Sequence, residues 1–357
     1  MAEISKKFTT ERFDVLYEVE EAQDGLRLDQ LLQQYFVSFS RQQIKKKIKA
    51  GDIKIQGRPH PHKASVKVYH REKIEMFTLR GDLENEYWRG DLVELKEPEI
   101  IYKDDDLLAI SKPAYMATHP TGRHLFNCCT VFYEQMFGHT IHSVHRLDRE
   151  TSGVQLLARN PKTAQKCTSM FERDEVSKCY FFMAHKKKSN TYPLTATERM
   201  GAIIGYEPQL YVHIYPNSST EGKHAETTYV DLYEDDQYFL GLAFPRTGRQ
   251  HQIRAHAAYH GLPLIGDKLY NGDNKVFGRF KDGIATEADH DLMQISRHAL
   301  HAIALKMPYP NKENPIVFKT DIPQDFKDWI KSNLSQLDIS KLEKDINDKI
   351  QTRLGKK

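Results

Sequence analysis

The sequence predicts an α+β protein in which a small α/β domain precedes a larger domain. Segments with the periodicity of strands and of helices are mixed along the chain without a strict β-α-β alternation, which is typical of the α+β class. The length of 357 residues allows two or three domains. Apolar residues make up 39% and charged residues 28%, so the composition is that of an ordinary globular protein.

Changes in composition divide the chain into five segments. We expect a polar lead-in over 1–20, a small basic domain over 21–80, a linker over 81–98, a larger domain over 99–322 and a helical tail over 323–357. Within the larger domain, residues 271–296 form a long polar excursion. Apolar residues at helical spacing in the tail predict a helix docked on the larger domain, and a partner-binding or dimerising helix is the alternative.

No feature of the sequence predicts a membrane-spanning or secreted protein. No apolar run approaches the roughly 18 residues that a membrane helix needs. Residues 1–8 contain two lysines without an apolar stretch behind them, which does not match a secretory signal. The four cysteines form no C-x-x-C pair and fit free thiols in a reducing compartment. We therefore expect a cytoplasmic protein, and an organellar location stays open.

The small domain is expected to begin with two helices, of which the second is strongly basic. Apolar residues from Leu28 to Phe36 recur at spacings of three and four. Ser40 and Gln43 form a capping-box pattern for a second helix, which Gly51 would end. From Arg41 to Lys73 there are eleven Lys and Arg residues against two acidic ones, a concentration typical of a nucleic-acid contact. A solvated basic face without a partner is the alternative.

This region resembles the alpha-L RNA-binding motif, a small domain first described in a ribosomal small-subunit protein. The matching residues are Arg27-Leu28-Asp29, Ser40-Arg41 and the run from Lys49 to Gly57. The resemblance implies a basic helix that lies along RNA phosphates, where affinity is mainly electrostatic. The side chains that we expect to bind RNA in this domain are those of Arg41, Lys45, Lys46, Lys49 and Lys54.

The chemistry is expected in the larger domain, within the segment His145-Arg146-Leu147-Asp148-Arg149-Glu150-Thr151-Ser152-Gly153. This charged segment leads through Gly153 into an apolar run that predicts a buried strand. Asp148 would then lie just outside the strand, where Arg146 and Arg149 would hold it ionised. An ionised carboxylate can act as a nucleophile or a base at a sugar carbon. A surface ion pair is the alternative.

The segment resembles the catalytic motif His-Arg-Leu-Asp-x-x-Thr-Ser-Gly of the RluA-like pseudouridine synthases. The resemblance implies that Asp148 is the catalytic carboxylate. It also implies that Arg146 helps to open the RNA helix around a flipped nucleotide. The fold implied is the pseudouridine synthase fold, a mixed and largely antiparallel sheet flanked by helices.

Further segments match this family in the same order, so the resemblance, together with the N-terminal motif, covers about residues 26 to 322. They are Ile110-Ser111-Lys112-Pro113 with Thr118-His119-Pro120, Lys178-Cys179-Tyr180, and the runs from Arg246 to His256, from Gly261 to Asp267 and from Arg297 to Ala302. The resemblance implies that Tyr180 is the active-site tyrosine and that Arg254 pairs with Asp148. Arg149 and Arg249 lie within two of these motifs, and we expect both to contact RNA.

The implied reaction isomerises uridine to pseudouridine in structured RNA. The bond from ribose to N1 of uracil breaks, the base turns, and a new bond forms at C5, after the nucleotide has left the base stack. Asp148 would attack the sugar carbon or remove a sugar proton to give a glycal, and both routes stay open. The reaction needs no metal and no small-molecule cofactor. We expect a monomer whose partner is RNA, with ribosomal RNA ahead of transfer RNA because of the added RNA-binding domain.

Two other functions stay open on the sequence alone. A metal hydrolase would use His256 and His260, which are four apart as helical zinc ligands can be, although the chain has no His-Glu-x-x-His pattern. A non-catalytic RNA-binding or ribosome-assembly protein would use the basic helix. Such a protein needs none of Asp148, Tyr180 and Arg254. One tightly bound zinc per chain would indicate the first function, and RNA binding without turnover would indicate the second.

Overall fold

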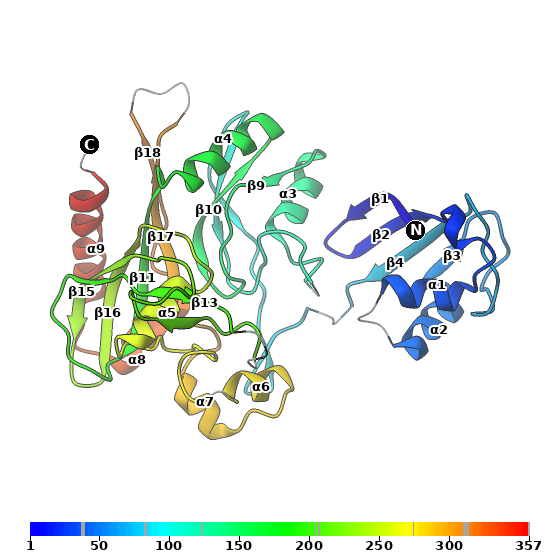
Figure 1. The fold of residues 1–357 in the computed structure, drawn as a ribbon. Helices are drawn as coiled ribbons and strands as arrows, with labels where there is room; N and C mark the ends of the chain where they lie inside the picture. Colours follow the sequence, from blue (N-terminus) through cyan, green and yellow to red (C-terminus); the bar gives the residue numbers. More distant parts are fainter. Residues whose placement is uncertain are drawn as a thin grey trace. The chain divides into compact units, whose positions relative to one another are not determined.

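The computed structural model describes residues 1–36, 40–81, 84–122, 124–203, 205, 208–273, 275–309 and 314–355. The chain forms two compact units, one of Met1–Asn85 with His119–Gly138 and the other of Glu86–Thr118 with His139–Lys357. Figure 1 shows their elements coloured along the sequence. Within the described ranges, no helix has the length and apolar character needed to span a membrane.

The first unit contains a four-stranded antiparallel sheet in the order β1-β2-β4-β3. Its strands are β1 (Ala2–Phe8), β2 (Arg12–Glu18), β3 (Ile53–Ile55) and β4 (Lys73–Leu79). Most of residues 1–20, which we expected as a lead-in before the small domain, thus belongs to this sheet. The physical reason is the alternation of Phe13, Val15 and Tyr17, which packs every second side chain of β2 on the core of the unit.

Two helices of the first unit pack on the same core, α1 (Leu28–Tyr35) and α2 (Arg41–Ala50). The predicted capping box is confirmed, because the Ser40 and Gln43 side chains each accept a hydrogen bond from the other residue's backbone N–H. Gly51 ends α2 in the left-handed conformation at a φ of 82°. Ile44 and Ile48 are buried, so the basic residues of α2 occupy its remaining faces. The unit also contains η1 (Glu21–Gln23) and α3 (Cys129–Phe137).

The second unit is built on a ten-stranded sheet. Its main path runs β12-β15-β16-β11-β17-β10-β8-β7, and β18 and β9 pair with β17 and β10. The strands are β7 (Glu99–Lys103), β8 (Leu107–Lys112), β9 (His142–Ser143), β10 (Ser152–Ala158), β11 (Ser177–His185), β12 (Leu194–Ala196), β15 (Thr227–Glu234), β16 (Tyr238–Pro245), β17 (Leu300–Met307) and β18 (Ile316–Lys319). Among these strands the pairing of β10 with β17 is parallel and the others are antiparallel, which confirms a mixed and largely antiparallel sheet.

Side chains alternate along β11 and thereby separate the two faces of the sheet. Cys179, Phe181 and Met183 pack on α8 (Gln324–Asn333) and α9 (Ile339–Leu354), the orange and red helices of Figure 1. The helical tail is therefore docked on the sheet. Tyr180 lies between Cys179 and Phe181, and its side chain therefore belongs to the opposite face of the sheet. That face is covered by α5 (Gln252–Tyr259).

Further short elements lie outside the ten-stranded sheet. The segment that we expected as a linker contains a small hairpin of β5 (Tyr87–Trp88) and β6 (Asp91–Leu92). The polar excursion contains α6 (Val276–Lys281) and α7 (Glu287–Met293). The remaining elements are α4 (Pro161–Glu172), β13 (Arg199–Gly201) and β14 (His213–Tyr215).

Gly153 fixes where the charged segment before β10 meets β17. It has a φ of 107°, and a Cβ built there would lie 2.2 Å from the carbonyl oxygen of Ala302. A glycine is therefore required for the close parallel pairing of Gly153 with Ala302. This pairing sets the end of β10 and with it the position of the loop that carries Asp148.

Candidate active site

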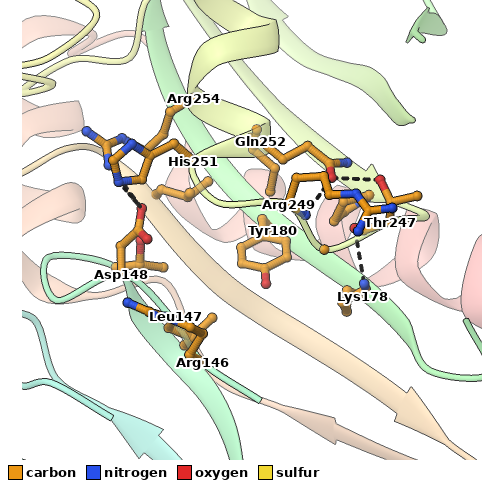
Figure 2. Close-up of a pocket in the computed structure, with 15 residues that line it drawn as sticks. Arg146, Leu147, Asp148, Lys178, Tyr180, Thr247, Arg249, His251, Gln252 and Arg254 are labelled. Carbon is orange, nitrogen blue, oxygen red and sulfur yellow. Dashed lines mark hydrogen bonds and ion pairs between the residues drawn. The ribbon is translucent and has the colours of Figure 1, made fainter. Parts of the chain in front are cut away.

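A pocket of about 100 Å³ lies on the α5 face of the sheet. Figure 2 shows that most of its lining side chains come from the loop before β10, from β11, and from the first turn of α5 with the segment that leads into it. The charged and hydrogen-bonding residues among them include Arg146, Asp148, Lys178, Tyr180, Arg249, His251 and Arg254. Three segments that are distant in sequence thus meet at one pocket.

Asp148 and Arg254 form the central ion pair of this pocket. Nη1 of Arg254 donates a hydrogen bond to Oδ2 of Asp148 at 3.0 Å. The Asp148 side chain keeps 24% of its surface exposed, whereas that of Arg254 keeps 6%. The carboxylate is therefore anchored from one side and still reachable from the pocket, which is the arrangement that a catalytic carboxylate requires.

Asp267 holds Arg254 from behind, a role that the sequence did not predict. Its two carboxylate oxygens accept hydrogen bonds from Nε and Nη2 of Arg254 at 2.7 and 2.8 Å, and its side chain is fully buried. The preceding Gly266 has a φ of 75°, and a Cβ there would lie 1.9 Å from the carbonyl oxygen of Arg297. The sequence indicated only that the run from Gly261 to Asp267 matches the family. The role of Asp267 depends on its contact with Arg254 of α5, which the sequence does not show.

The surroundings of Asp148 favour its ionised form. Burial alone would raise the pKa of this carboxyl, but the neighbouring His251, Arg254 and His298 lower it, and the result lies well below the ordinary value. Burial alone would lower the pKa of Arg254, but Asp267 and Asp148 raise it. Asp148 is thus a carboxylate and Arg254 a cation throughout the physiological pH range.

Tyr180 lies on β11 and its ring faces the pocket, as Figure 2 shows. Burial, and then the charge of Asp148, raise the pKa of its hydroxyl. The phenol is therefore neutral. Nearby, Nζ of Lys178 donates a hydrogen bond to the carbonyl oxygen of Thr247 at 3.2 Å, and burial lowers the pKa of this lysine.

His251 also lines the pocket, although no individual role was predicted for it from the sequence. It begins α5 with a φ of 53°, an uncommon left-handed conformation for a residue other than glycine. Its Nε2 lies 3.9 Å from Oδ2 of Asp148, and its Nδ1 lies 3.2 Å from the hydroxyl of Tyr270. Burial, and then Arg254, lower the pKa of His251 to about 4, so its ring is neutral near pH 7.

Comparison with known proteins places the chain among RNA-modifying enzymes. The sequence model of the RNA pseudouridylate synthase family matches residues 106–259, which include Asp148, Tyr180 and Arg254. Over 317 residues the chain is 29% identical to the ribosomal large subunit pseudouridine synthase D of Vibrio cholerae, covering 86% of this chain and 91% of that protein. The family model and this relative together support the family that the sequence predicted, that of the RNA pseudouridine synthases. The expected enzyme class, RNA pseudouridine synthase, is therefore confirmed.

Two further similarities describe relatives of this synthase. It is 33% identical over 196 residues to the mitochondrial tRNA pseudouridine(32) synthase of Saccharomyces cerevisiae, and this match covers 55% of the chain but 41% of the yeast protein. The solved structure of human RNA Pseudouridylate Synthase Domain Containing 4 has a TM-score of 0.50 and 21% identity, covering 65% of this chain and 91% of that one. The second similarity supports the fold that the sequence predicted.

Several polar residues hold the loop that carries Asp148, residues 145–151. Nζ of Lys112 donates hydrogen bonds to three carbonyl oxygens, including that of Arg149 at 3.1 Å. The Gln155 amide donates to the hydroxyl of Thr118 and to the carbonyl oxygen of His145. The His145 ring accepts the backbone N–H of Leu156, and burial lowers its pKa to about 3. His145 is thus a neutral structural residue.

Arg146, which we expect to help open the RNA, and the two arginines of the second unit that we expect to contact RNA differ in their surroundings. Arg146 is exposed and lines the pocket. Arg249 is also exposed, and its Nε donates to the carbonyl oxygen of His224 at 3.2 Å. Arg149 directs its guanidinium to the carboxylate of Glu86 and keeps 23% of its side chain exposed.

The basic residues of α2 belong to the first unit. Lys45, Lys46 and Lys49 are exposed. Arg41 donates to the buried carboxylate of Asp29 at 3.3 Å, and Lys54 is half-buried near the ring of Phe77. The structure therefore presents three lysines of α2 to solvent.

His256 and His260, the candidate zinc ligands, both bind protein groups. The His256 ring contacts the hydroxyl of Thr227 and the carbonyl oxygen of Glu198, and the His260 ring contacts the Glu198 carboxylate at 3.1 Å. Among the described residues, no group of three or more His, Cys, Asp and Glu side chains has the arrangement of a metal site.

Proposed function

We propose that this synthase isomerises uridine in ribosomal RNA, with Asp148 as the carboxylate that acts on the ribose. The observation that carries the proposal is the position of Asp148, ionised, partly exposed in a pocket, and hydrogen-bonded to Arg254 at 3.0 Å. An ionised carboxylate fixed by a buried arginine is pre-organised to attack or to accept a proton without first reorganising.

The chemical steps conserve the atoms of the nucleotide. The bond between ribose C1′ and uracil N1 breaks, the base turns, and C1′ bonds to C5, after which C5 loses its hydrogen to water and N1 gains one. Asp148 assists the first step by attack at C1′ or by removal of the neighbouring sugar proton. Arg254 keeps the carboxylate charged in either route. The reaction is redox-neutral and transfers no external group, so we expect no cofactor.

Tyr180 and Arg146 would act on the base and on the opened RNA. The neutral Tyr180 ring faces the pocket next to Asp148, where it can pack against uracil. Arg146 is exposed at the pocket, where it can hold the RNA open after the target has left its stack. Unstacking costs least in loops and bulges, so we expect the target uridine there.

The choice of ribosomal RNA rests on the relatives and on the N-terminal unit. The Vibrio cholerae relative, which the chain matches over 91% of its length, is named for the large ribosomal subunit. The yeast relative is named for transfer RNA, which makes transfer RNA the second candidate. The exposed lysines of α2 would add phosphate contacts on a large structured RNA. We propose that the enzyme works as a cytoplasmic monomer.

Tritium release from RNA that carries 5-tritiated uridine tests this function. Wild-type protein should release tritium from large-subunit ribosomal RNA transcripts, and Asp148→Asn should release none while it binds the same RNA. Asp235→Asn is a matched control, because Asp235 is also a carboxylate with a lowered pKa but lies in the turn between β15 and β16. Release from transfer RNA alone would replace the proposed substrate, and loss of RNA binding in Asp148→Asn would give Asp148 a structural role.

A further inference from the structure

The small hairpin of β5 and β6 packs against the polar excursion through side-chain contacts. Trp88 of β5 stacks on Phe280 of α6 with ring centroids 6.0 Å apart, and it meets His290 of α7 edge-on at 4.6 Å. Arg89, in the turn of the hairpin, forms ion pairs with Glu287 and Asp291 of α7. An isolated two-stranded hairpin is marginally stable, so these contacts define its position.

The excursion is itself connected to the active site at both ends. The excursion follows Asp267, which binds Arg254, and it ends just before Arg297; Nζ of Lys268 donates to the carbonyl oxygen of Ser296 at 2.7 Å. Lys268 also lies 5.6 Å from the centroid of the Phe280 ring. Internally, Arg279 of α6 is bound by the carboxylate of Asp289 in α7. The excursion is therefore held by contacts between its own helices and by the hydrogen bond between Lys268 and Ser296 at its two ends.

The hairpin and the excursion each hold one of the two residues that follow Asp148. Glu86, which precedes the hairpin, forms an ion pair with Arg149, and both side chains are about one-quarter exposed. Lys268 donates to Oε1 of Glu150 at 3.0 Å, while His298 contacts the other oxygen of that carboxylate. Partly buried charge pairs are screened less than exposed ones, so these contacts can restrain the loop.

We propose that Glu86 and Lys268 are positioning residues that act on Asp148 through Arg149 and Glu150. This inference rests on the proposed function. The hairpin with Glu86 and the excursion with the residues from Lys268 onward, which we call the clasp (the described residues of 86–92 and 268–296), fix the loop so that the Asp148 carboxylate meets Arg254. The clasp explains why the chain carries a polar excursion beside the catalytic loop. It also gives Arg149 a role within the protein.

Kinetics of Glu86→Gln provide the first test. Loss of the ion pair should leave the RNA dissociation constant and KM unchanged and lower kcat by about tenfold or more, because displacement of a catalytic group by about 1 Å has such an effect. Glu86→Asp should recover part of kcat. Arg149→Gln should lower kcat to the same extent as Glu86→Gln, and the double variant should be no slower than either one, because all three lose the same contact.

Glu234→Gln is the matched control. It removes a half-buried ion pair with Lys186 in the same unit, at the far end of β11 from the pocket. Its kcat should equal that of wild type even if its melting temperature falls as far as that of Glu86→Gln. If wild type releases tritium and Glu86→Gln has wild-type kcat, or if Glu234→Gln slows turnover equally, the clasp has no positioning role and the proposed function stands.

Hydrogen exchange tests the clasp without turnover. The backbone amides of residues 145–151 should exchange faster in Glu86→Gln and in Lys268→Met than in wild type, and at the wild-type rate in Glu234→Gln. Unchanged exchange in both clasp variants overturns the inference. If wild type releases no tritium from any transcript, the proposed function fails, and this measurement still decides whether the clasp restrains the loop.

Discussion

Replacement of Asp267 by asparagine tests how the active-site arginine is supported. Asp267 binds Arg254 through two hydrogen bonds of 2.7 and 2.8 Å, and its side chain is fully buried. Asparagine keeps the shape and one oxygen, but it removes the negative charge and turns an amide donor toward the guanidinium. Arg254 then keeps Asp148 as its single carboxylate partner among the described residues.

The expected loss can be estimated from this geometry. Removal of one partner of a buried ion pair costs about 3–5 kcal/mol, and the retained oxygen of asparagine favours the lower end, about 3 kcal/mol. A domain of 150–250 residues loses about 2–4 °C in Tm for each kcal/mol, so the Tm of the catalytic unit should fall by about 6–12 °C. Without its two hydrogen bonds to Asp267, the Arg254 side chain should move and let Asp148 shift. We expect this shift to lower kcat roughly tenfold to hundredfold.

Thermal unfolding by circular dichroism and single-turnover tritium release measure the two effects. Asp29→Asn is the control, because Asp29 is also fully buried and binds Arg27 through two hydrogen bonds of 3.0 Å, but it lies in the first unit. It should lower stability without lowering turnover at saturating RNA. Wild-type Tm and turnover in Asp267→Asn would refute the view that Asp267 supports the site.

Two further predictions concern RNA affinity and pH. Replacement of Lys45, Lys46 and Lys49 by alanine should weaken RNA binding and reduce the salt dependence of log K by about one unit for each lost phosphate contact; titrations at several salt concentrations check this, and an unchanged slope would leave α2 a solvated face. The folded-state pKa of Asp148 is lowered, so its stabilising contribution is complete above the unfolded value near 4 and is lost as pH falls. Urea unfolding between about pH 5 and pH 2 should show a shallower loss in Asp148→Asn than in wild type, and equal slopes would contradict the lowered pKa.

Local sequence patterns predicted the elements whose structure depends on neighbouring residues. The capping box of Ser40 and Gln43 and the terminating Gly51 define α2, because caps satisfy backbone groups within one helical turn. The predicted boundary at residue 20 left β1 and β2 outside the small domain. β2 is held by pairing with β4, a contact between segments that are distant in sequence, and β1 pairs with β2.

In the candidate active site, too, residues within recognisable sequence motifs were predicted, whereas residues placed by contacts between distant segments were not. The motif around Asp148, the strand residue Tyr180 and the helix residue Arg254 were predicted because each lies in a segment that resembles its counterpart in the family. The side chains that complete the site were not. Asp267, His251 and Glu86 acquire their roles from the turn at Gly266, from the left-handed start of α5 and from the hairpin that meets Arg149.

The sequence by itself determined the reaction class and pointed to the central carboxylate, because its motifs resemble those of a family that carries out this reaction. Tertiary structure decided which groups surround that carboxylate. Asp148 is ionised and oriented by Arg254 and not by its sequence neighbour Arg149, whose guanidinium binds Glu86. Adjacent side chains on a loop need not face each other, whereas residues brought together by packing and shielded from water interact strongly at short range.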